Sequence, residues 1–243
     1  GHAWIRALAC DVLGELRSPG QDGEVAKALA EIAGDSSASF ITRSAASRAL
    51  GKLNYRGVAV NATELASQVG KLALDALEAE ADREIPDFEQ LLAEKKGTAA
   101  TMGMGMPGME GMMMDPMMMG APGMPGMGAP PKQEDELKEL EKEHSLVLRR
   151  RLMDRMAAAI SGVSGGADEQ SKGIVAAAVE PQQKQFVDAL AQKLDAVKNL
   201  CSNDDLGYEP LVSQLKEQAK QMRTAVDKPA AAGSNAGAPA PAT

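Results

Sequence analysis

The sequence predicts an all-α protein with a short solenoid of helical repeats, a disordered linker rich in Met, Gly and Pro, and a small antiparallel helical bundle. Three observations predict this fold class. Apolar residues recur at intervals of three and four along most of the 243 residues, which is the helical period. One Trp, two Tyr and three Phe are the only aromatic residues, so the cores must use Ala, Leu, Val, Ile and Met, which suits closely packed helices. The third observation is an internal repeat.

The internal repeat relates residues 4–16, WIRALACDVLGEL, to residues 41–53, ITRSAASRALGKL, without a gap and at a period of 37. The residues that both copies share are the pairs Arg6 and Arg43, Ala9 and Ala46, Leu13 and Leu50, Gly14 and Gly51, and Leu16 and Leu53. A fixed period of this length is typical of stacked helical units, each too small to bury its own apolar face. We interpret the two matched arginines as packing residues between repeats and not as two separate functional sites.

A second amphipathic helix is predicted after each copy of the repeat. In the first of these helices, which Gly34 ends, one face carries Val25, Ala28, Leu29 and Ile32. Before the second, Asn61 and Glu64 have the spacing of a capping box, which marks a helix start. The apolar stripe of that helix continues through Leu65, Val69, Leu72 and Ala76.

The pattern R-x-x-A…A-L-G-x-L resembles that of the HEAT-repeat family. The second copy carries it in full, at Arg43, Ala46, Ala49, Leu50, Gly51 and Leu53, and the first copy departs from it at Val12, where the pattern prefers Ala. The resemblance covers residues 3 to about 82, a third of the chain. It implies an α-solenoid of paired helices whose concave surface commonly binds other proteins, and it implies no catalytic residues.

Composition changes divide the rest of the chain. A short helix is predicted after Pro86, and Gly97 is expected to end it. We therefore place the HEAT-like repeats at residues 1–96, a disordered linker at 97–131, a helical bundle or hairpin at 132–228, and a disordered tail rich in Ala and Pro at 229–243.

Three helices are predicted for the bundle. The first runs from Gln133 to Ile160, and its apolar stripe is Leu137, Leu140, His144, Val147, Leu148, Leu152, Met156 and Ile160. The stripe of the second is Phe186, Leu190, Leu194, Val197 and Cys201, and that of the third is Leu211, Leu215, Ala219, Met222 and Val226. We interpret His144 as a partly buried imidazole and Cys201 as a small core residue.

Twelve of the fifteen methionines lie in the linker. A tether without a fold of its own is one interpretation, because its Gly and Pro content opposes regular structure. An adaptable apolar surface for a partner helix is another. A third is soft-metal binding, because thioethers are ligands for Cu(I). The candidate ligands are Met102, Met104, Met106, Met109, Met112, Met113, Met114, Met117, Met118, Met119, Met124 and Met127.

The sequence gives little support for other classes of function. The net charge is −8, and the one basic cluster, residues 149–151 with Arg155, follows an acidic run in the same helix, so we expect a solvated helix face and no nucleic-acid binding. No apolar run has the roughly 20 residues of a membrane span. A G-x-S-x-G match at residues 162–166 follows a helix, whereas the chemistry needs a strand-to-helix turn. We therefore expect no enzyme and no cofactor.

The sequence thus favours a non-enzymatic interaction or scaffold protein that binds other proteins, with Cu(I) binding by the linker as the alternative. The chain begins at Gly1 without Met and enters a helical pattern at Trp4. That first helix is apolar around more of its surface than one neighbouring helix can cover, at Trp4, Ile5, Leu8, Ala9, Val12, Leu13 and Leu16. We therefore expect an exposed apolar patch here, and at least one further repeat before Gly1.

Overall fold

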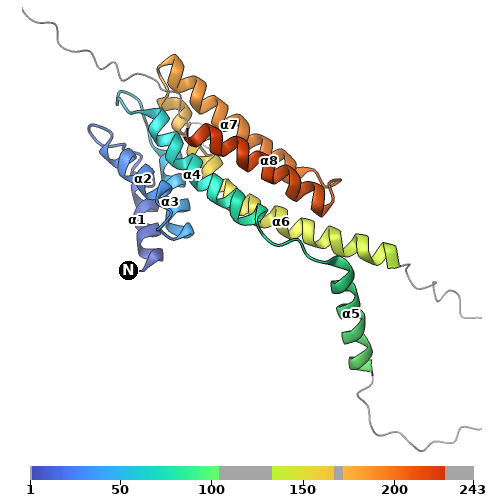
Figure 1. Cartoon of the computed structure of the whole chain (residues 1–243). Helices are drawn as coiled ribbons and strands as arrows, with labels where there is room; N and C mark the ends of the chain where they lie inside the picture. Colours follow the sequence, from blue (N-terminus) through green and yellow to red (C-terminus); the bar gives the residue numbers. More distant parts are fainter. Residues whose placement is uncertain (1, 104–132, 167–171, 228–243) are drawn as a thin grey trace, which may run out of the picture. The chain divides into compact units, whose positions relative to one another are not determined.

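The computed structural model describes residues 2–103, 133–166 and 172–227, and these residues form helices and loops without a strand (Figure 1). The predicted all-α class is confirmed for them. The elements are α1 (Ala3–Leu16), α2 (Glu24–Gly34), α3 (Phe40–Lys52), α4 (Ala62–Ala81), α5 (Phe88–Gly103), α6 (Gln133–Ser164), the 3₁₀ helix η1 (Ile174–Ala177), α7 (Pro181–Ser202) and α8 (Tyr208–Asp227). The linker at residues 104–131 and the tail at 229–243 lie outside the described residues.

The compact units have other bounds than those that the sequence suggested. One unit comprises residues 1–83 and 146–243, and the other comprises residues 84–145, so α6 contributes to both. In the first unit α4 packs against α7 and α8. A β-carbon on Gly70 of α4 would lie 2.8 Å from a methyl carbon of Val226 and 3.5 Å from Leu190. The expected separation of a 1–96 domain from a 132–228 bundle is thus replaced by a shared core.

The physical reason for this shared core is that the buried residues of α4 lie around much of the helix. This helix buries thirteen of its residues, which occupy more of its surface than α2 alone can cover. The partners that cover the remainder come from the C-terminal third of the chain, because α7 and α8 each have a strong apolar stripe. All five positions predicted for the α8 stripe are buried, as are four of the five for α7.

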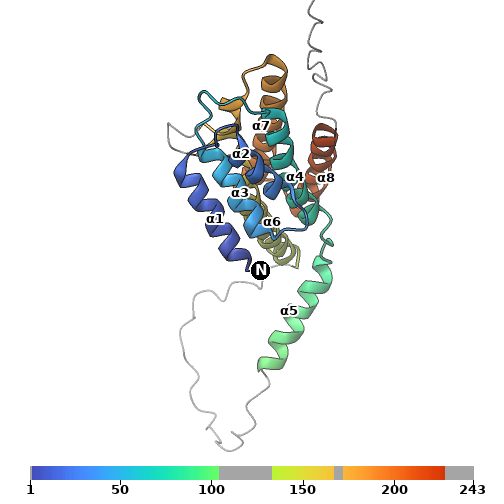
Figure 2. The same cartoon turned by 90° about the vertical axis from the view of Figure 1, so that its left-hand side faces the viewer.

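The first unit also contains a row of closely packed helices. Helix α1 packs against α3, while α2 packs against both α3 and α4 (Figure 2). The end of α6 contacts the side of α3, where the Ser47 hydroxyl donates a hydrogen bond of 2.9 Å to the carbonyl of Ala158. The order of contact is therefore α1, α3 and the last turns of α6.

Local signals set several of the helix starts. Asn61 accepts a hydrogen bond of 3.2 Å from the Glu64 amide and so caps α4, as its spacing predicted. Ser39 caps α3 in the same way, and Pro181 starts α7. The expected stop at Gly97 is wrong, because α5 continues to Gly103. An interior Gly costs a helix only about 1 kcal/mol, which the helix-favouring residues on both sides can offset.

The buried face of α2 also differs from the predicted one. It consists of Ala26, Leu29, Ala30 and Ala33, whereas Val25 and Ile32 are half-buried and Ala28 is exposed. Small residues at these positions let α2 approach α3 and α4 closely. Close approach increases dispersion contacts, which compensates for the smaller apolar side chains.

The second unit, residues 84–145, contains α5 and the first part of α6. The Phe88 and His144 rings meet edge to face with centroids 5.4 Å apart, and a ring nitrogen of His144 lies 3.0 Å from the Leu140 carbonyl oxygen. Lys95 and Lys96 of α5 pair with Glu143 and Glu136 of α6, at 3.4 and 2.9 Å. The interpretation of His144 as a partly buried imidazole is confirmed.

Candidate protein-binding surface

The outward face of α1 is the largest run of exposed apolar side chains on one described helix. We define this outward face as four residues spaced by three and four, which are Ile5, Leu8, Val12 and Leu16. Between 49% and 68% of each side chain is exposed, and Trp4 beside them is also exposed. Surfaces of this kind, in which large apolar groups cluster instead of scattering singly, mark sites of interaction.

The opposite face of α1 explains why the large residues point outward. The residues that α1 buries are small ones, Ala7, Cys10 and Gly14. A β-carbon on Gly14 would lie 2.9 Å from the Ala49 Cα of α3, which is closer than real β-carbons approach. The two backbones therefore meet at Gly14, and the bulky side chains of α1 have room only on the far side.

Two ion pairs flank the contact between α1 and α3, and each joins residues 37 positions apart. Lys52 lies 2.6 Å from a carboxylate oxygen of Glu15, and Arg48 lies 3.8 Å from Asp11. The hydrogen bond from Lys52 holds the pKa of Glu15 below its usual value. Exposed pairs like these stabilise a fold little, but both join matching positions of the two repeats.

The contact between α3 and α6 repeats the one between α1 and α3. Ser47 and Gly51 of α3 occupy the positions 37 after Cys10 and Gly14 of α1. A β-carbon on Gly51 would collide with the carbonyl group of Ser161, and one on Gly162 would lie 2.8 Å from the Ser47 carbonyl oxygen. Each helix of the row thus presents its small-residue face to the next helix.

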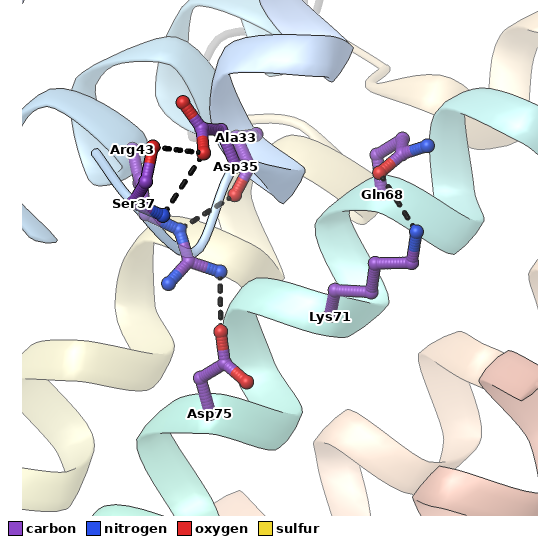
Figure 3. A network of polar contacts seen from close by, with 7 residues as sticks. All are labelled: Ala33, Asp35, Ser37, Arg43, Gln68, Lys71 and Asp75. Carbon is purple, nitrogen blue, oxygen red and sulfur yellow. Dashed lines mark hydrogen bonds and ion pairs between the residues drawn. The ribbon is translucent and has the colours of Figure 1, made fainter.

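Arg43 confirms the predicted packing role of one of the two matched arginines. It is buried, its Nε donates a hydrogen bond of 2.9 Å to the Ala33 carbonyl at the end of α2, and its guanidinium lies 2.7 Å from the Asp75 carboxylate (Figure 3). Beside it Ser37 donates to Asp35, which lowers the pKa of that carboxyl. Arg6, the equivalent residue of α1, is exposed and forms no ion pair with any residue in the described part of the chain.

A buried carboxylate, which the periodicity could not reveal, connects the end of α4 to α6. Glu80 is fully buried between Arg83 and Arg155, at 3.1 Å from each guanidinium, and Arg155 also lies over the Phe40 ring. A carboxylate so enclosed needs its cations, because a buried unpaired charge is costly. Because two arginines neutralise Glu80, a structural role is enough to explain this buried carboxylate.

The basic cluster is only in part the solvated face that the sequence suggested, because Arg150 and Arg151 are exposed but Arg149 and Arg155 have partners within the fold. Arg149 is buried and donates hydrogen bonds of 2.7 and 2.6 Å to the carbonyls of Asn203 and Leu206 in the turn before α8. Arg155 is only one-third exposed. Acidic neighbours in the same helix do not determine the partners of these long side chains, because loops and helices distant in sequence supply them.

A pocket of about 810 Å³ lies where α1 and α3 end. The described residues that line it include Arg17, Arg56 and Lys172, and none of these described residues is acidic. The last carbonyls of two helices face this region, so basic side chains here complement the negative helix ends. Among the described lining residues, no nucleophile is paired with a base.

The candidate metal ligands are the methionines of the linker. Met102 lies in α5 by its backbone, and the other eleven methionines, from Met104 to Met127, lie outside the described residues. Within the described part of the chain, no three His, Cys, Asp or Glu side chains converge to hold a metal ion. Cys10 and Cys201 are free thiols, and burial raises the pKa of both, to about 11 for Cys201. Cys201 is thus a small core residue, as predicted.

Across the ranges described, no helix has both the length and the apolarity that a membrane span requires. Comparison of the chain with family models, curated proteins and solved structures finds no match. The arrangement of residues itself therefore has to indicate the function. Its most unusual feature is the apolar outward face of α1, and the chemistry that such a face offers is the binding of another apolar surface.

Proposed function

We propose that this chain is a non-enzymatic protein-binding module that uses the outward face of α1. The observation that carries the proposal is the inverted packing of α1, which buries Ala7, Cys10 and Gly14 and leaves Leu8 and Val12 in solvent. A helix that served only its own fold would gain more by burying the larger side chains. Exposing the larger side chains to water is unfavourable, and association with a partner would bury them.

The HEAT-like pattern supports the same proposal. Helices one period apart, α1 and α3, lie side by side, as do α2 and α4. That order of contacts is the one expected of a short solenoid, in which each unit contacts only its neighbours. The resemblance implied a concave binding surface, and we propose instead the end of the row, because the exposed apolar residues lie there.

Photo-crosslinking tests the proposal. A photoreactive amino acid is placed at Val12 on the outward face, or at Val179, which is 87% exposed in a loop before α7 and serves as the control. In lysate from the source cell, position 12 should capture a defined protein that position 179 does not. Leu8→Glu in the same chain should abolish that capture. Equal capture at both positions would contradict the proposal.

Soft-metal binding by the linker methionines is the alternative function. Its support is compositional, since twelve thioethers within 26 residues could supply the three sulfur ligands that Cu(I) accepts. It makes no use of the outward face. The two functions are therefore separable by mutation, and the copper test is described below.

A further inference from the structure

The internal repeat shows what kind of structure covers a face like the outward face of α1. Moving 37 positions along the chain converts Ile5, Leu8, Val12 and Leu16 into the residues Thr42, Ala45, Ala49 and Leu53. At most 3% of each of these four side chains is exposed. The Thr42 hydroxyl donates to the Ala3 carbonyl, and Ala49 meets Gly14. The equivalent face of α3 is therefore covered by a helix, α1, through that helix's small-residue face.

Two arginines of the row show that a second helix takes part in each contact between successive units. Arg43 reaches the last turn of α2, at Ala33, and Arg155 reaches the last turn of α4, at Glu80. Each arginine thus binds the C-terminal end of the second helix in the unit before its own. A cation at that place complements the negative end of the helix. Arg6 occupies the same position in α1 and has no such helix end to bind.

We propose that the outward face of α1 binds a pair of helices from a partner protein, packed as α1 and α2 pack on α3. This inference rests on the proposed function and specifies its partner. The first partner helix presents small residues at positions i, i+3 and i+7, corresponding to Ala7, Cys10 and Gly14. The end of the second partner helix accepts hydrogen bonds from Arg6.

Charge specifies the partner further. In α3, Arg48 and Lys52 reach across to the acidic residues of α1. The positions that correspond to them in α1 are Asp11 and Glu15, so α1 offers acids where α3 offers bases. The first partner helix therefore carries basic residues at positions i+4 and i+8, because like charges at these places would repel.

A second copy of this chain does not meet these requirements. The small-residue faces that it could offer, on α1 and α3, are already buried in its own fold. A second copy could place its own outward face against this one, but both faces carry bulky side chains. The row of contacts inside the chain never uses that kind of packing.

The repeat also separates Trp4 from the binding surface. Its equivalent in α3 is Ile41, which is 64% exposed although α1 covers the neighbouring Thr42. Trp4, itself 64% exposed, should therefore stay accessible when the partner is bound. This expectation is specific, because tryptophan is usually a dominant residue of an interface.

An added helix pair tests the inference within the full chain. A copy of residues 2–38 is fused before His2, which places it one period ahead of α1. In the copy, Cys10→Ser follows the residue of α3 at that position, Asp11→Arg and Glu15→Lys supply the bases, and polar residues replace its own outward face. The original chain, which follows the copy, carries Val12→Cys or, as the control, Trp4→Cys.

The readout is the rate at which the introduced thiol reacts with a maleimide at neutral pH. The added pair should slow the reaction of the thiol at position 12 by about tenfold or more, and that at position 4 by less than about twofold. A matched pair with Gly14→Leu in the copy should give no protection, since its backbone cannot approach α1. Equal rates at position 12 with both pairs, or an added pair that gains no helix by circular dichroism, would overturn the inference.

Two further outcomes separate this inference from the proposed function. If crosslinking from position 12 captures a partner but the added pair does not protect, the partner has another structure and the binding function stands. If the added pair protects and no partner is captured, the face accepts a helix pair but no partner protein supplies one, so the proposed function fails and the inference that rests on it fails too. A dimer of the unmodified chain in sedimentation, dissociated by Leu8→Glu, would make a second copy the occupant and would refute the partner proposed above.

Discussion

The backbone of Ala49 lies so close to Gly14 that a β-carbon at position 14 would be 2.9 Å from the Ala49 Cα and 3.1 Å from its Cβ. Gly51, one period later, makes the equivalent close approach to Ser161 of α6. The 37-residue period of the sequence is thus a period of packing, in which glycine sets the distance between successive helices. The arrangement leaves large apolar side chains on the outer side of α1.

Replacement of Gly14 should separate α1 from α3. We expect Gly14→Val to lower the free energy of unfolding by about 1–3 kcal/mol, because the new side chain overpacks a backbone contact. Urea denaturation followed by circular dichroism measures the loss. Gly97→Ala is the control, since no described atom beyond its own stretch of helix lies within 4 Å of the added methyl group and alanine favours the helix. An unchanged midpoint for Gly14→Val would mean that the contact is looser than described.

The helices themselves were predictable, and the faces they bury were only partly so. Periodicity identified the stripes of α7 and α8, where one face is apolar and the other is charged. It failed for α2 and could not decide for α1, because Ala and Gly compete with Leu and Val through the distance at which helices pack. That distance depends on the partner helix, which local sequence does not specify.

Long-range partners were the other limit of prediction. The linker separates the two halves along the chain, and for that reason the sequence suggested two domains. The shared core arises because α4 needs more than one apolar neighbour and α7 and α8 supply them. The enclosure of Glu80 by Arg155, 75 positions away, likewise depends on the tertiary fold and has no signal in the local pattern.

Separation of residues 132–228 from the rest of the chain should therefore unfold them. A fragment of residues 132–228 lacks α4, against which α7 and α8 pack so closely that a β-carbon on Gly70 would lie 2.8 Å from Val226. We expect circular dichroism to show a large loss of helix relative to the same residues in the full chain, with no cooperative thermal transition. A fragment that melts cooperatively with full helicity would show that this part has a core of its own.

The two cysteines should be unreactive in the folded protein. Burial raises the pKa of Cys10, and that of Cys201 rises from 9.0 to about 11, so both remain protonated at pH 8. Because the folded pKa lies above the unfolded one, their stabilising contribution is complete below the unfolded pKa and is lost as the pH rises through the folded value. A disulfide reagent at pH 8 should react slowly with the native chain and at once in denaturant. Fast reaction of either thiol in the native chain would contradict this prediction.

The linker methionines should not give this protein high affinity for Cu(I). If the linker acts only as a tether, replacement of its twelve methionines by Leu or Ser should leave Cu(I) affinity at the level of an unrelated protein, since no preorganised ligand set is lost. Competition against a Cu(I) chelator measures the affinity. Tight binding that disappears on replacement would instead support the metal-binding alternative.

The most direct test of the central claim asks whether the outward face of α1 stays open in the free protein. In the purified chain, Leu8→Glu with Val12→Glu should change the free energy of unfolding by less than about 0.5 kcal/mol. The same substitutions should remove most of the fluorescence of a bound hydrophobic dye. Leu50→Ala, at a fully buried leucine of α3, should cost about 2–5 kcal/mol in the same urea titration. A loss of that size for the α1 variant, with dye binding unchanged, would show that these side chains belong to a core and would contradict the account.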